Sequence, residues 1–380
     1  MLDDAGEGWL GTFDVSLVLG GGNALGAYHL GVCEELAARR VHPSWYLGAS
    51  IGAVTAAILV GNPPATRIER LREFWNQAAQ PSNPWLRLLP DEARARWSNL
   101  FGFGTALLGR TGLSAPRWPG PLSVMPGSPP DRAVQDMTPL RRSLERLVDF
   151  DRLNAAPERV SLVATDLHTA EEVWFDTREG GIGPDEVLAS AALTPLFPPV
   201  EIEGRWLCDG GLRNNLPLER VFAEPLARPM LCVASDLYGL GGVRPSSIDR
   251  AVTRAQDLAF GAQARRGIEH LGRERELLRR LDPSTPAAII AHLAYQAPAH
   301  ERSLKALDFS VTALRGRVEQ GRAHGAALHQ SLQVMPADHA LAVVRLPHTG
   351  EQVTQGASRQ EELKRSLDMA METVLVESHA

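Results

Sequence analysis

The sequence has few cysteines and no excess of positive charge. Its three cysteines are an odd number and lack the spacing of a metal site. This excludes a disulfide scaffold and a cysteine zinc site, and we expect Cys33, Cys208 and Cys232 to be buried thiols in a reducing compartment. The 39 basic residues against 45 acidic ones give a net charge of −6, so we expect no nucleic-acid partner.

Long apolar runs are also absent, since none approaches the roughly 20 residues that a membrane-spanning helix needs. The first ten residues, MLDDAGEGWL, lack the basic and apolar regions of a signal peptide. These absences predict a soluble, cytoplasmic protein. Arginines within 265–280 alternate with glutamates, which is typical of a solvated helix face rather than a phosphate-binding patch.

The apolar fraction of 44% and the charged fraction of 22% are those of a globular protein with a core. A strand at 13–19, a helix at 24–39, a strand at 45–47 and a helix at 51–60 follow one another. This alternation implies an α/β fold with parallel strands and right-handed crossovers. Later patterns predict strands at 159–165, 171–176, 205–208, 229–236 and 287–295, and helices at 66–79, 138–149, 185–193, 247–281, 303–333 and 358–376.

Residues 80–135 interrupt this pattern with nine prolines and five large aromatic residues. A long proline-rich connection in a compact protein is functional or disordered, and the aromatic residues argue against disorder. We interpret it as a partly ordered cap over something apolar, with a plain surface insertion as the alternative. Trp85, Trp97 and Trp118 are candidates for contact with a membrane or lipid-droplet surface.

Residues 18–26, VLGGGNALG, end a strand in glycines and lead into a helix. Backbone N–H groups at such a helix N-terminus are suited to bind an anion. A dinucleotide site would need G-x-G-x-x-G and an acidic residue about 20 positions later. Gly20, Gly22 and Gly26 instead give G-x-G-x-x-x-G, without that carboxylate. We favour an anion hole for a reaction intermediate; a nucleotide site and a purely structural turn are the alternatives.

Residues 48–52, GASIG, place a serine between two glycines at the junction of a strand and a helix. Gly48 and Gly52 permit the sharp turn that lifts the Ser50 oxygen clear of the sheet. The positive end of the following helix also points at this position. Ser50 is therefore the candidate nucleophile, and an ordinary tight turn is the alternative.

A serine hydroxyl needs a base. The α/β-hydrolase plan would supply a histidine, but Ser50 comes too early in the chain for that plan, and the histidines after residue 200 lie mostly in helical, charged or terminal segments. Asp209 ends a strand, and burial would raise its low pKa enough for it to accept the serine proton. A capping aspartate is the alternative. Asp166 and Asp236 also follow strands, where we expect turns or caps.

The order of these motifs, a glycine-rich loop, G-x-S-x-G and a later D-G-G, resembles that of the patatin-like phospholipases. The segments ATDLHTAEEVWF, ASAALTPLFPPV and DGGLRNNLPL also resemble that family, and the resemblance covers roughly 13–240. It implies a three-layer α/β/α fold with a mainly parallel central sheet. It also implies a Ser–Asp dyad without histidine, hydrolysis of acyl esters on lipids, and no metal or other cofactor.

Carried over residue by residue, the resemblance implies that Ser50 is the nucleophile and Asp209 its base. The backbone amides of Gly21, Gly22 and Asn23 would form the oxyanion hole. The motif glycines are Gly20, Gly26, Gly48, Gly52, Gly210 and Gly211.

Two positions depart from the family pattern. Leu25 stands where many members have a basic residue, and Asn23 replaces a glycine. Losing the positive charge would weaken oxyanion stabilisation or the preference for a phospholipid head group, but it would not remove the amides.

The expected organisation is a hydrolase domain at 1–240 that includes the cap, an extension at 241–345 and a polar tail at 346–380. The extension is expected to be mostly helical, and HLAYQAPAHERSLKALDFS resembles that of a bacterial subgroup of the family. Its apolar spacing suits packing on the core or contact between copies of the chain.

The expected function is a serine hydrolase of phospholipase A or lipase type, acting on a lipid or other acyl ester at the periphery of a membrane or lipid droplet. One alternative is a catalytically weak lipid-binding or scaffolding protein, which Leu25 favours. Another is an acyl-CoA or small-ester hydrolase that uses the same chemistry.

Overall fold

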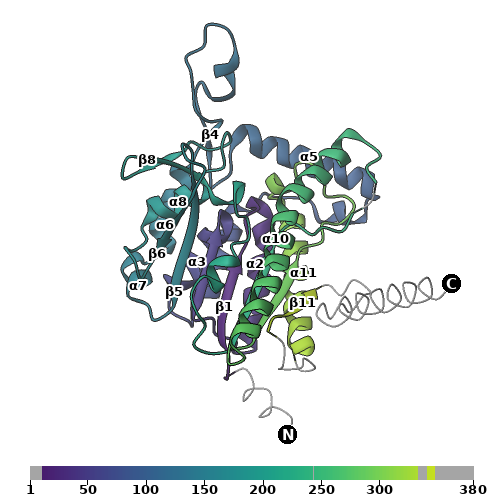
Figure 1. Ribbon diagram of the computed structural model, residues 1–380. Helices are drawn as coiled ribbons and strands as arrows, with labels where there is room; N and C mark the ends of the chain where they lie inside the picture. The colour runs from purple at the N-terminus through teal and green to yellow at the C-terminus, as the bar shows by residue number, and fades with distance from the viewer. Residues whose placement is uncertain (1–10, 243, 333–339, 347–380) are drawn as a thin grey trace, which may run out of the picture.

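The computed structural model describes residues 11–242, 244–332 and 340–346. Its centre is a nine-stranded sheet in the order β11-β10-β9-β1-β2-β5-β8-β7, with β6 paired to β5 (Figure 1). The strands are β1 (Asp14–Leu19), β2 (Trp45–Ala49), β5 (Arg159–Asp166), β6 (Glu172–Asp176), β7 (Val200–Ile202), β8 (Arg205–Asp209), β9 (Met230–Asp236), β10 (Ala288–Ala294) and β11 (Ala342–Leu346).

The sheet is mainly parallel, as predicted. Strands β11, β10, β9, β1, β2 and β5 form a parallel series, while β6, β7 and β8 pair antiparallel at one side. Strands covered on both faces are continuous apolar runs, which explains why FDVSLVL and PMLCVASD were recognisable as strands. Strands β7 and β11 are short and were not predicted.

Helices cover both faces of the sheet and complete three α/β/α layers. Leu17 and Leu19 of β1 pack into the cluster that holds α2, α3, α4 and α11. Val18 points to the other face and packs with Ile268 and Leu271 of α10. The helices are α2 (Ala27–Ala38), α3 (Ile51–Val60), α4 (Arg67–Ala78), α5 (Asp91–Leu108), α6 (Thr138–Leu147), α7 (Phe150–Ala155), α8 (Pro184–Ala191), α9 (Glu219–Phe222), α10 (Ile248–Leu281) and α11 (Val311–Leu332).

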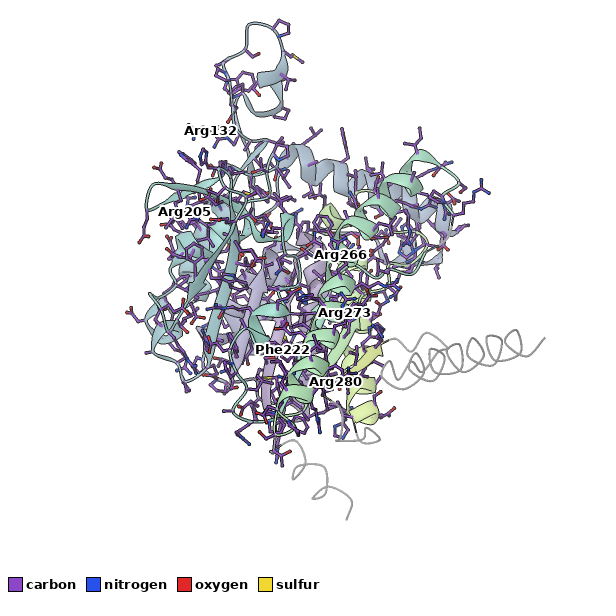
Figure 2. The ribbon with its side chains drawn as sticks, viewed as in Figure 1. Arg132, Arg205, Phe222, Arg266, Arg273 and Arg280 are labelled. Carbon is purple, nitrogen blue, oxygen red and sulfur yellow. The ribbon has the colours of Figure 1, made fainter. Side chains whose placement is uncertain are left out.

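The segment 241–345 contributes to the central sheet as well as to the helical layers. Strands β10 and β11 extend the parallel series beyond β9. Helix α11 crosses α2 so closely that a side chain at Gly31 would lie 2.1 Å from the carbonyl oxygen of Val318. Along α10, Arg266, Arg273 and Arg280 are exposed (Figure 2), and Arg280 pairs with Glu276, as expected for a solvated face. The helix predicted at 358–376 lies outside the described residues.

The segment 80–135 contains a long helix that the sequence did not predict, α5, and the short elements η2 (Pro84–Leu88), β3 (Ala115–Pro116), η3 (Gly120–Val124) and β4 (Gln135–Asp136). Helix α5 lies at the carboxyl end of the parallel strands (Figure 1). Within the described ranges, no helix is both long enough and apolar enough to cross a membrane.

Candidate active site

Ser50 sits on the sharp turn between β2 and α3. Its backbone has φ 57° and ψ −124°, in the region that residues other than glycine rarely adopt. The turn also needs the glycine after it, because a side chain at Gly52 would lie 2.0 Å from the carbonyl oxygen of Leu19. Such backbone strain is typical of functional sites, where the surrounding structure holds it in place.

Asp209 ends β8 and faces Ser50. Its side chain is 2% exposed, and its Oδ1 accepts a 2.7 Å hydrogen bond from the Gly211 N–H. Burial raises the pKa of the Asp209 carboxyl from 3.8 to about 6, although its interactions with the Ser50 side chain and the Gly211 amide oppose the rise. The fold therefore brings together the two side chains that the sequence analysis singled out.

The end of α8 positions both residues, a feature that the sequence analysis missed. The Ser50 N–H donates to the backbone carbonyl of Ser190 at 3.1 Å, and the Ser190 hydroxyl donates to the Val163 carbonyl at 2.6 Å. Two residues later, the Ala192 carbonyl accepts the Asp209 N–H at 3.0 Å. The only signal in the sequence was the resemblance of ASAALTPLFPPV to the family.

The glycine-rich loop lies beside Ser50, but its first expected donor is already engaged. The Gly21 N–H donates to the carbonyl of Asn215 at 3.1 Å. This bond occupies the Gly21 N–H in the structure, and the expected part of that amide in an oxyanion hole stays a prediction. Gly22 and Asn23 line the cavity with Ser50, and Asn23 has a φ of 51°.

The other motif glycines are all buried at the three junctions. Gly20 and Gly26 lie in the first loop and Gly48 at the end of β2. Residues 210–211 directly follow Asp209 in η4 (Gly210–Leu212).

Asn215 and His29, which the sequence analysis did not identify, hold the loop in place. Asn215 is 3% exposed, and its Nδ2 donates to the Gly21 carbonyl at 3.1 Å. His29 Nε2 lies 2.9 Å from the Gly20 carbonyl, and Nδ1 lies 2.8 Å from the Ser235 hydroxyl. Because a carbonyl only accepts, Nε2 carries the proton. Burial lowers the pKa of His29 to about 4, so the ring is neutral at pH 7.

Ser50 and Asp209 open into a cavity of about 220 Å³ with mainly apolar walls. Leu113 is its one lining residue from residues 80–135, so the expected cap contributes little of the cavity wall itself. The extension supplies more of the wall, through Gln256, Phe260, Ser303, Leu304, Ala306 and Leu307. The remaining apolar lining comes from Ile51, Val54, Leu140, Ala191, Leu193, Leu196, Phe197 and Tyr238.

Arg317 of α11 joins that wall to the glycine-rich loop. Its guanidinium is fully buried and pairs with Glu301 at 3.0 Å. It also donates to the carbonyls of Ala24 at 3.0 Å, Asp308 at 2.9 Å and Lys305 at 2.9 Å. A positive charge therefore approaches the loop from α11.

Leu25, which occupies the place of the family's basic residue, is itself fully buried in the main apolar cluster. It is not part of the cavity wall. The motif position that departs from the family pattern therefore serves the core in this chain.

The other two strand-end aspartates make turns and side-chain hydrogen bonds and do not line the cavity. Asp166 accepts the N–H groups of His168 and Thr169, and its hydrogen bond with Arg205 lowers its pKa to about 2. Asp236 accepts the Tyr238 N–H at 3.0 Å and lies 2.9 Å from Nε2 of His292. Among the described residues, no three His, Cys, Asp or Glu side chains are grouped as metal ligands would be.

A second cavity of about 560 Å³ is lined in part by Arg213 and Asn214, which follow Asp209 in the chain. Its lining is polar and includes Arg213, Arg266 and His270. Neither Ser50 nor Asp209 lines it, so the candidate pair belongs to the smaller, apolar cavity.

Comparison with known proteins gives related findings. Uncharacterized NTE family proteins of Mycobacterium bovis and Mycobacterium tuberculosis are 27% identical over 207 residues, which are 54% of this chain and 44% of each relative. The chain thus matches less than half the length of these relatives. Among solved structures, VipD from Legionella pneumophila has a TM-score of 0.37 at 15% identity, covering 84% of this chain and 67% of its own. The type III effector ExoU has a TM-score of 0.32 at 17% identity, covering 85% and 54%.

The model of the family described as patatin-like phospholipase matches residues 17–222, more than half of the 380 residues. This stretch contains all three motifs and the strands that place them. The chain belongs to the patatin-like phospholipase family.

Proposed function

We propose that this protein is a serine hydrolase that cleaves fatty acyl esters with Ser50 as the nucleophile and Asp209 as its base. One observation carries the proposal: a serine on a strained turn shares an apolar cavity with a buried carboxyl whose pKa is raised to about 6. Membership of a family of lipid acyl hydrolases supports the reaction class.

Asp209 suits the part of a general base without a histidine. A carboxyl with a pKa near 6 is still mainly ionised at pH 7, and it is a stronger base than a free aspartate with a pKa of about 3.9. In the proposed first step it takes the hydroxyl proton while Ser50 Oγ attacks the ester carbonyl carbon. Among the residues lining the cavity there is no histidine that could replace it.

The amides of Gly22 and Asn23 are the proposed donors to the oxyanion, since both residues line the cavity beside Ser50. Donors aimed at the developing charge contribute about 3–4 kcal/mol each to lowering a barrier. Asn215 and His29 would act as positioning residues, because they bond to the carbonyls of Gly21 and Gly20 and so fix the direction of the loop.

The second half of the cycle uses the same carboxyl. Asp209 returns its proton to the leaving alcohol oxygen, which leaves the acyl group bonded to Ser50 Oγ. It then takes a proton from water, whose oxygen attacks the acyl carbon. The bond from that carbon to Ser50 Oγ breaks, Asp209 gives its proton to Oγ, and the fatty acid is released. No metal or cofactor is needed for any step.

The cavity favours an apolar acyl group as the part of the substrate that is held. Its volume of about 220 Å³ is below the roughly 300–1,000 Å³ of most ligand pockets, so it suits one slender chain. An acyl-CoA or a small ester carries the same acyl carbonyl and remains an alternative substrate.

The alternative of a catalytically weak lipid-binding protein is favoured by the engaged Gly21 amide, which leaves one oxyanion donor fewer than the family pattern implies. Labelling with a fluorophosphonate probe separates the two functions. We expect the wild type to label, Ser50→Ala not to label, and Asp209→Asn to label far more slowly.

Detergent and lipid are included in parallel samples, so that an occluded cavity is not mistaken for an inactive one. If the folded wild type is labelled under none of these conditions, the hydrolase proposal is refuted and the lipid-binding function is favoured. A positive result is followed by a panel of phospholipids, neutral lipids and acyl-CoA.

A further inference from the structure

We propose that the outward side of α5 docks onto an anionic lipid bilayer. This outward side consists of Trp97, Leu100, Phe103, Leu107 and Leu108. The docking is argued from the residues exposed on this surface. Its purpose, which is to bring the cavity to a lipid substrate, rests on the proposed function.

Helix α5 turns its apolar residues to solvent. Trp97, Leu100, Phe103, Leu107 and Leu108 are 40%, 57%, 55%, 48% and 74% exposed. Their spacing of three and four residues puts them along one side of the helix. The buried residues are instead small or polar: Ala95, Ser98, Gly102 and Thr105. This is the reverse of a helix that packs on a core, and such a continuous apolar surface marks an interaction site.

Specific contacts hold α5 in this orientation. The Ser98 hydroxyl donates to Asp308 at 2.7 Å, and a side chain at Gly102 would lie 2.6 Å from the Cβ of Leu304. The helix therefore cannot rotate its apolar side inward without losing a buried hydrogen bond and colliding with the segment beneath. Leu304 also lines the active-site cavity, so the docked helix would lie directly over the cavity wall.

The loop that follows α5 projects at the same end of the molecule as α5 (Figure 1). Trp118, Val124 and Met125 are 84%, 85% and 55% exposed. Tryptophan is favoured at the boundary between lipid and water, because its ring is apolar and its N–H can face water.

The charge of this region selects the kind of lipid. Residues 93–130 contain four arginines and no aspartate or glutamate, although the whole chain has a net charge of −6. Two of them form ion pairs, Arg94 with Asp91 and Arg117 with Asp131 and Asp136, whereas Arg96 and Arg110 form none among the described residues. Basic residues next to an apolar helix side add attraction to anionic lipids of about 1 kcal/mol each near the surface.

The same charges argue against a second copy of the chain as the occupant. A two-fold contact through this side would face each copy's residues 93–130 with the same residues of the other. Arg96 and Arg110, which form no ion pair among the described residues, would meet no acidic residue from the same stretch of the other copy. An anionic bilayer satisfies both the apolar side chains and the arginines.

The test is cosedimentation of the full chain with vesicles of phosphatidylcholine, with or without one third phosphatidylglycerol. The variant is Leu100→Ser/Phe103→Ser/Leu107→Ser. The matched control is Leu277→Ser/Leu278→Ser/Leu281→Ser on α10, where the leucines are 59%, 41% and 84% exposed. That end of α10 lies far from α5 (Figure 1).

We expect the wild type and the control to bind anionic vesicles, and the α5 variant to bind at least about tenfold more weakly, because binding scales with buried apolar area. Binding should also weaken in high salt, since salt screens exposed charges. Hydrolysis of a soluble short-chain ester should stay unchanged in the α5 variant, which shows that the fold and the site are intact.

Equal binding of the wild type and the α5 variant would overturn the docking proposal. So would a wild type that hydrolyses the soluble ester but ignores both kinds of vesicle, or one that forms dimers through α5 instead. A wild type that binds anionic vesicles through α5 but hydrolyses no ester would leave the docking standing and refute the proposed function.

Discussion

Replacing Asp209 by Asn should make the protein more stable at neutral and alkaline pH while it removes the catalytic base. Asp209 is 2% exposed, and burial raises the pKa of its carboxyl from 3.8 to about 6. A group whose pKa is raised on folding contributes its stability below its unfolded pKa, and loses it as the pH rises through the folded pKa. Above pH 6 the folded protein therefore holds a buried charge at a cost.

The size of that cost follows from the shift. About two pKa units at about 1.36 kcal/mol each correspond to roughly 3 kcal/mol. Asparagine has the shape of the protonated acid, does not titrate, and can still accept the Gly211 N–H through its side-chain oxygen. The variant should gain stability relative to wild type as the pH rises from 4 to 8, by up to about 3 kcal/mol, with most of the change between pH 4 and pH 6.

The assay is urea unfolding of both proteins at each pH, compared as the difference in their free energies of unfolding. All other titrating groups are common to both proteins, so their contributions to the free energy of unfolding cancel in this difference. Asp166→Asn is the control with the opposite sign, because the pKa of Asp166 is lowered to about 2 by its hydrogen bond with Arg205. The ionised Asp166 stabilises the folded protein at any pH above the pKa that this carboxyl has in the unfolded chain. Asp166→Asn should therefore be less stable than wild type at neutral pH, and the difference should shrink in acid. A difference for Asp209→Asn that is independent of pH would refute the reasoning.

Four further outcomes follow from the same contacts. A plot of log kcat/KM of the wild type against pH should rise with unit slope below about pH 6 and level off above it. Asp209→Asn should lower kcat/KM about 10²–10⁴-fold. A pH profile that is flat through pH 6 would show that Asp209 is not the base. Gly52→Ala should prevent folding or abolish fluorophosphonate labelling, since its new methyl would lie 2.0 Å from a backbone oxygen; normal melting and labelling would contradict this. Arg317→Leu should destabilise the protein by about 3–5 kcal/mol in urea unfolding, because Glu301 would stay buried without its partner, and Arg317→Leu/Glu301→Gln should recover part of the loss. Leu307→Trp should lower kcat/KM for long-chain esters more than for acetyl esters, since Leu307 lines the cavity, and an equal effect on both would argue against an acyl site there.

Much of the fold and the identity of the candidate pair could be predicted from the sequence because these features depend on local patterns. The strands nearest the site are continuous apolar runs, and each ends in glycines that permit the close turn its neighbours require. Ser50 and Asp209 both stand at such turns, so their roles could be suggested before their distance was known.

The arrangement around the pair could not be predicted, since it depends on contacts between distant parts of the chain. The bonds from the Gly21 amide to Asn215, from His29 to Ser235 and from Arg317 to Ala24 join segments that are far apart in the sequence. Only the packed sheet brings these partners within hydrogen-bonding distance.

The sequence by itself determined the strands and helices next to the candidate pair and the turns that hold Ser50 and Asp209, because backbone sterics and apolar periodicity act over a few residues. The tertiary structure decided which amides stay free, which segment walls the cavity and which side of α5 faces outward. Leu100 and Phe103 look like core residues in the sequence, but Gly102 and Ser98 allow the closer approach to the segment beneath, so the apolar side is the one left in solvent.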